Sequence, residues 1–100
     1  METALTKATA SEIVVPWFRS EDWTQWRALL ADGHRLPLDY RTWFFRADMV
    51  RKRLERDGAH VDLIVIEPDI FARWCRAHGH TPNTDASVRF AAEVKAHRFA

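Results

Sequence analysis

The apolar pattern is clearest between Val61 and Ile66, in the run V-D-L-I-V-I, which predicts a β-strand over residues 60–66. Five of these six residues are apolar and four are β-branched, a composition typical of a strand buried on both faces. The run ends at residues 67–69, E-P-D, where a proline suited to a first helical position favours an immediate helix start. The sequence therefore predicts a strand followed by a tight turn into a helix.

A second β-branched run, I-V-V, is shorter and ends at Pro16. Proline has no N–H to donate to a sheet ladder, so it is confined to edge strands and strand ends. We therefore expect a minor strand over residues 13–16 that lies at an edge of the sheet.

Four segments repeat apolar residues every three or four positions, which is typical of amphipathic helices. Ser20 and Asp39 are suited to cap the first two helices, and a glycine follows the last apolar residue of each. Thr81 followed by proline marks the start of the last helix. The expected helices cover residues 20–32, 39–57, 68–78 and 82–97.

The second helix carries the most regular apolar stripe, which we expect to face the core. The stripe comprises Tyr40, Trp43, Phe44, Ala47, Val50 and Leu54. With all elements in place the order is β-α-α-β-α-α, and the fold class is α+β. The connection between the strands is long enough for a parallel, right-handed crossover, and an antiparallel pair remains open.

Composition predicts a single α+β domain over residues 12–100, because 47% apolar residues in a chain of this length can close one core. Residues 1–11 lack the apolar segment of a signal peptide, and we expect a flexible tail there. The one cysteine favours a reducing compartment, so the expected location is cytoplasmic. No stretch approaches the roughly 20 apolar residues of a membrane span, and no membrane association is expected.

Two strands leave two sheet edges, and a long apolar edge strand invites pairing with another chain. A two-fold axis between equivalent strands would cover that edge, so a homodimer through Val61, Leu63 and Val65 is the leading hypothesis. A helix or the N-terminal tail of the same copy is the alternative cover.

Eight aromatic residues fall between Trp17 and Phe45. Most of them lie on the predicted inner stripes and belong to the core. Trp17 and Phe45 lie off those stripes, so we expect them to be exposed anchors for a partner protein that the sequence does not identify.

The second helix is basic, with six Arg or Lys residues against two acidic ones between residues 41 and 56, while the whole chain has a net charge of only +1. This local charge makes nucleic acid an alternative partner. A solvated face explains the same charges, because Asp48 can pair with Lys52 and Glu55 with Arg51. The candidate nucleic-acid residues are Arg46, Arg51, Lys52, Arg53 and Arg56.

A third hypothesis is a small metal site at Cys75, His78 and His80, since sulfur and imidazole ligands suit zinc. A structural zinc site needs four ligands, and the chain offers no second cluster of this kind. The alternative is that Cys75 packs in the helix stripe and that His78 complements the helix dipole.

The sequence shows no nucleophile with a base, no paired carboxylates and no phosphate loop at a recognisable spacing. We therefore expect no cofactor and favour a non-catalytic role.

Two motifs, P-W-F-x-x-E-D-W from Pro16 and I-E-P-D-I-F-A-R-W-C from Ile66, resemble a group of short bacterial proteins of unknown function. The resemblance covers about residues 15 to 92 and implies a free-standing bacterial cytoplasmic protein. It implies no activity, ligand or site residue. The leading hypothesis from the sequence is a small, homodimeric interaction or accessory protein.

Overall fold

The computed structural model describes residues 12–98, and the predicted order β-α-α-β-α-α and the α+β class are confirmed there. Residues 1–11, for which the sequence predicts a flexible tail, lie outside the described residues. The elements are β1 (Glu12–Trp17), the 3₁₀ turn η1 (Ser20–Asp22), α2 (Trp23–Leu29), the 3₁₀ turn η2 (Gly33–Arg35), α3 (Tyr40–Arg56), β2 (His60–Val65), α4 (Pro68–His78) and α5 (Thr84–Arg98).

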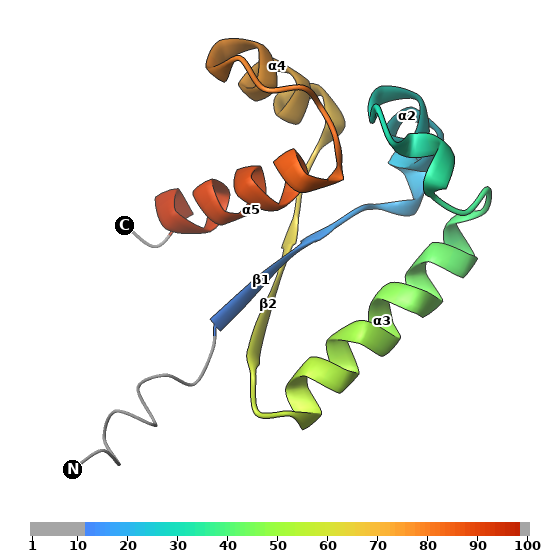
Figure 1. Ribbon diagram of the computed structural model, residues 1–100, viewed down its shortest axis with the longest axis vertical. Coiled ribbons are helices and arrows are strands. Elements are labelled where there is room, and N and C mark those ends of the chain that lie inside the picture. The colour runs from blue at the N-terminus through green and yellow to red at the C-terminus, as the bar shows by residue number, and fades with distance from the viewer. Residues whose placement is uncertain (1–11, 99–100) are drawn as a thin grey trace.

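β1 and β2 form a parallel two-stranded sheet, in a register that pairs Ile13 with Val61 and Trp17 with Val65. The relative direction of the two strands, which the sequence left open, is therefore parallel. α2 and α3 supply the long crossover that parallel strands need. α3 runs along one side of the two strands and α5 along the other (Figure 1). The sheet is the middle layer of three.

The core lies where the carboxyl ends of the strands meet α2 and α4. Trp26 and Phe71 are completely buried, with ring centroids 5.3 Å apart. Phe18, directly after β1, places its ring 4.6 Å from that of Trp26. Because large aromatic rings bury the most apolar area, this end of the molecule is the well-packed end.

The first predicted helix, 20–32, is shorter in the structure. Ser20 opens a 3₁₀ turn without a side-chain cap, and the α-helix ends at Leu29. Gly33 does not act as a helix stop. It is buried, and a Cβ at this position would lie 2.1 Å from the carbonyl oxygen of Arg27. The close return of the chain against α2 therefore requires glycine.

α3 starts as predicted, because a side-chain oxygen of Asp39 accepts a hydrogen bond from the backbone N–H of Thr42 at 3.1 Å. The inner stripe that the sequence predicts for α3 is only partly confirmed. Phe44 and Val50 are 40% and 54% exposed, and no residue of α3 is buried. A sheet of two strands is narrower than this stripe, so the flanks of the stripe stay in solvent.

β2 corrects the expectation of a strand buried on both faces. Ile64 and Ile66 are 4% and 2% exposed, whereas Leu63 and Val65 are 38% and 46% exposed. Side chains alternate across a strand, so one face of β2 is closed and the face toward α3 is half open. The strand also ends one residue earlier than predicted, at Val65.

α5 begins at Thr84, two residues later than predicted, because Asn83 and not Thr81 provides the cap. The side-chain oxygen of Asn83 accepts a hydrogen bond from the backbone N–H of Ala86 at 2.8 Å. Phe90 of α5 is 6% exposed and packs against Phe71.

Candidate interaction surfaces

The outer edge of β2 carries backbone groups that point away from β1. The N–H of Ile66 donates to the carbonyl oxygen of Trp17 at 3.2 Å, and backbone direction alternates along a strand. The backbone N–H and C=O groups of the even-numbered residues of β2 therefore point toward β1. Val61, Leu63 and Val65 direct their N–H and C=O groups outward, so the three strand residues named as interface candidates share one edge.

The outer edge of β1 differs because it contains Pro16. By the same alternation Ile13, Val15 and Trp17 face β2, so Pro16 belongs to the outward set and removes one donor from it. A hollow of about 250 Å³ beside Pro16 is lined by side chains of both α3 and α5, including Ala47 and Val88. The prediction that Pro16 lies at a sheet edge is confirmed, and the edge of β2 is the one with all its donors.

Lys95 of α5 contacts both strands on the face of the sheet opposite α3. Its Nζ donates to Asp62 of β2 and to Glu12 Oε1 of β1, the latter at 3.2 Å. The hydrogen bond from Lys95 lowers the pKa of Asp62, and the same bond raises the pKa of Lys95. His60 Nε2 lies 3.5 Å from the Asp62 carboxylate. This cluster holds α5 across both strands.

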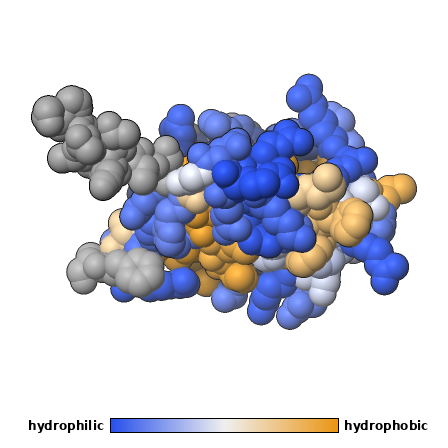
Figure 2. All heavy atoms as spheres, turned by 90° about the horizontal axis from the view of Figure 1, so that it is seen from below, coloured by the Kyte–Doolittle hydropathy of each residue, from blue (hydrophilic) through white to orange (hydrophobic). Residues whose placement is uncertain are grey.

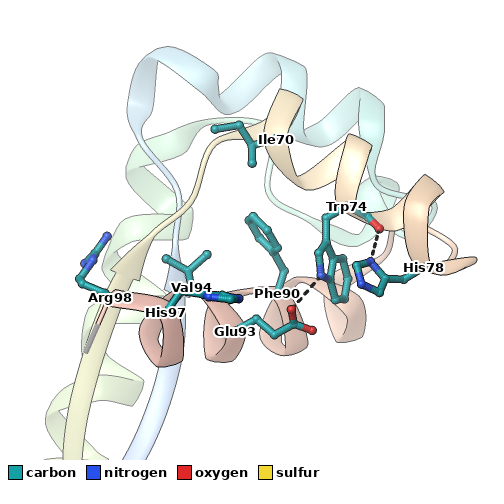
Figure 3. A pocket seen from close by; sticks show the side chains of 8 residues that line it. All are labelled: Ile70, Trp74, His78, Phe90, Glu93, Val94, His97 and Arg98. Atoms are coloured by element: carbon teal, nitrogen blue, oxygen red, sulfur yellow. Dashed lines mark hydrogen bonds between the residues drawn. The ribbon is translucent and has the colours of Figure 1, made fainter. Parts of the chain in front are cut away.

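A groove of about 640 Å³ lies between α4 and α5. Figure 3 shows Ile70 and Trp74 on α4 facing Phe90 on α5, with the Trp74 indole N–H donating to Glu93 Oε1 at 3.3 Å. A smaller hollow, which shares Ile70 and Phe90 with the groove, is also lined by Val65. Apolar surface on this face of the molecule therefore reaches the end of β2.

The three candidate metal ligands are not brought together as a ligand set. Cys75 is 1% exposed, and burial raises the pKa of its thiol. His78 places Nδ1 2.9 Å from the backbone oxygen of Trp74, and the His80 ring stacks on the Trp74 ring at 4.9 Å. Within residues 12–98 no group of three or more His, Cys, Asp or Glu could hold a metal ion.

Two of the five nucleic-acid candidates are bound to carboxylates of their own helix. Arg51 donates to Asp48 and to Glu55, the latter at 2.9 Å, and Lys52 lies 3.3 Å from Asp48. The hydrogen bond from Arg51 lowers the pKa of Asp48. The predicted pairs are confirmed, and they occupy the two acidic residues of α3.

The other three, Arg46, Arg53 and Arg56, are exposed and make no ion pair with the described part of the chain. Phe45 is 68% exposed, as expected for an anchor. Trp17 is only partly exposed, because its ring packs 4.9 Å from that of Trp43. The expectation of a freely exposed Trp17 is corrected.

Met49 and Ile70 are exposed apolar residues that the sequence pattern did not single out. Met49, 59% exposed, lies one helical turn after Phe45 and is also off the inner stripe, so the argument that singled out Phe45 applies to Met49 as well. Ile70, 42% exposed, lines the groove between α4 and α5. Seen from below, apolar surface gathers in the middle of the molecule and toward the side of α3, between hydrophilic flanks (Figure 2).

Among residues 12–98, no helix has the length and apolar character needed to cross a membrane. Comparison with known proteins identifies no relative: no family model, no curated protein and no solved structure matches the chain.

Proposed function

We propose that this chain acts as a homodimeric interaction protein without a catalytic centre, and that its two copies join through β2. The observation that carries the proposal is the outer edge of β2, where Val61, Leu63 and Val65 turn their backbone groups away from β1. A strand edge of this kind is best satisfied by another strand.

The two edges of the sheet are not equally suited to pair with a strand of a second copy. The edge of β1 lacks the donor of Pro16 and has α3 and α5 side chains beside it. The edge of β2 has all its donors, and the exposed side chains of Leu63, Val65 and Ile70 lie beside it. A second copy that pairs with β2 would cover backbone and apolar side chains together.

A two-fold axis makes the paired strands antiparallel and centres the contact on one residue. Only a register centred on Leu63 uses all three outward residues, with Leu63 opposite itself and Val61 opposite Val65 of the second copy. Each such pair exchanges two bonds, so the contact would form about six backbone hydrogen bonds. The result is a four-stranded sheet with the two α3 helices on one face and the two α5 helices on the other.

Disulfide trapping tests both the contact and its register. Residues directly opposite in a hydrogen-bonded pair have Cα atoms about 5.5 Å apart, which a disulfide can span. Leu63→Cys should therefore form a covalent dimer under mild oxidation. Val65→Cys is the matched control, because its two copies would lie about 14 Å apart along the strands. Cys75 is 1% exposed and should not interfere.

The proposal has two clear points of failure. Light scattering of the native chain that gives the mass of one copy at micromolar concentration would reject the dimer, as expected if residues of the same copy cover the edge. A dimer in which Val65→Cys forms the covalent link and Leu63→Cys does not would reject this register.

A further inference from the structure

The side of α3 that faces away from the sheet has the properties of a second interaction surface. Phe45 and Met49, one turn apart, are 68% and 59% exposed. They lie on the side of α3 opposite the inner stripe that faces the sheet. Arg41 precedes Phe45 by one turn, and Arg53 follows Met49 by one turn. We call these four residues, together with Arg56, the outer face of α3.

The charges on this outer face are free to meet a partner. Asp48 and Glu55, the acidic residues of α3, already bind Arg51 and Lys52. Arg41, Arg53 and Arg56 are exposed and form no ion pair within residues 12–98. The outer face therefore combines an apolar centre with cationic ends.

We propose that the outer face of α3 docks an acidic amphipathic helix of a partner protein. The apolar side of such a helix would cover Phe45 and Met49, and its carboxylates would pair with Arg41 and Arg53, whose guanidinium groups bind carboxylates in a bidentate manner. Phe45 and the arginines on either side of it, Arg41 and Arg46, line a shallow hollow of about 550 Å³ that suits one large apolar side chain.

The arrangement of the side chains favours a protein over nucleic acid. Single-stranded nucleic acid is bound by rows of aromatic rings on which successive bases stack, whereas Phe45 is followed along this face by the aliphatic side chain of Met49. Phosphate binding needs cations along the whole contact, whereas here apolar side chains occupy the middle. Flexible methionine side chains are common on surfaces that bind helices.

The length of the surface sets the length of the partner. The outer face spans 41–56 in the sequence, about 22 Å along the helix axis at 1.5 Å per residue. A partner helix of about 15 residues, with leucine at helical spacing on one side and glutamate beside it, matches that length and charge. The docking does not depend on the proposed dimer, because the outer face points away from the sheet that carries β2.

The test uses a fluorescent synthetic peptide of that design and a permuted peptide of identical composition whose leucines do not share a face. We expect the full chain to bind the first peptide, with affinity that falls as salt is raised. The double variant Phe45→Ser, Met49→Ser should weaken binding about tenfold or more, and so should Arg41→Glu, Arg53→Glu. Leu38→Ser is the matched control, since Leu38 is 79% exposed and lies outside α3, and it should bind normally.

Three results would overturn the proposal. The first is equal binding of the permuted peptide, which would mean simple charge attraction. The second is the absence of peptide binding at about 1 mM, the weak limit of a useful contact. The third is tighter binding of a dT oligonucleotide or of anionic lipid vesicles than of the peptide, with sensitivity to the same variants. Circular dichroism of each variant confirms that its fold is intact, which the exposure of the changed side chains leads us to expect.

Discussion

At the scale of single residues, Pro16 decides how the small sheet can grow. Its ring removes one donor from the outward set of β1, and no such gap exists in β2. The same alternation that places Pro16 outward places Leu63 outward on the other strand. One proline therefore distinguishes an edge that lacks a donor from an edge that has all of them.

Asp62 supports a prediction about pH. Lys95, with Glu12 and His60 nearby, holds the pKa of Asp62 below its ordinary value. A carboxylate with a depressed pKa in the folded state stabilises the protein above its unfolded pKa of about 3.9, and this contribution is lost as the pH falls through the folded pKa. Asp62→Asn should therefore be less stable than the native chain at pH 7, and the gap should close in acid below about pH 4.

Urea unfolding of both proteins from neutral to strongly acidic pH measures that gap. Asp85→Asn, a change at a side chain that is 82% exposed, serves as the control and should leave the profile unaltered. A gap between the native chain and Asp62→Asn that stays constant into strong acid would show that the carboxylate charge is not the cause.

At the scale of elements, α3 is the least covered helix of the described chain. It contacts β2 along one side, while Phe45, Met49 and the unpaired arginines occupy the other. Helices gain most of their stability from packing, so Phe45 and Met49 add little to folding, which is consistent with the proposed docking of a partner helix.

The start of α5 gives a second prediction, because sequence and structure place the cap differently. Asn83 accepts the hydrogen bond from the N–H of Ala86, so Asn83→Ala should lower the free energy of unfolding by about 1 kcal/mol. Thr81→Ala, at the position that the sequence pattern favours, should change it by less than about 0.5 kcal/mol. Chemical unfolding of the two variants decides the matter. A larger effect at Thr81 would contradict the observed cap.

At the scale of the whole molecule, the central feature is a sheet that is too small for its helices. Two strands cannot cover the apolar flanks of α3, and they leave one edge with all its donors and acceptors. A second copy would double the sheet and remove that edge, which is how oligomers commonly complete small cores.

A homodimer makes thermal stability depend on concentration. If the copies unfold as they separate, the melting temperature should rise as the chain is concentrated from about 2 to about 200 µM. Leu63→Lys places a charge at the strand edge and should abolish this dependence. Val88→Lys alters a similarly exposed residue, 42% against 38%, beside the edge of β1 and should preserve it. A native melting temperature that is independent of concentration would contradict the dimer.

Much of the fold follows from local pattern. The β-branched run before Glu67 predicts β2, Pro68 marks the start of α4, and Asp39 caps α3, because strand preference, proline geometry and capping depend on neighbouring residues in the chain. The pairing of Arg51 with Glu55 is predictable for the same reason, since residues four apart on a helix are neighbours.

The remaining features depend on contacts between distant segments. The exposure of Leu63 and Ile70, the packing of Trp17 on Trp43 and the burial of Cys75 follow from how the helices pack on the sheet and on one another. The sequence by itself determined which segments are helices and strands and that β2 needs a neighbour, because hydrogen-bonding capacity and apolar period are local. Only the tertiary structure decided which edge and which helix face remain uncovered, because burial depends on what every other segment already covers.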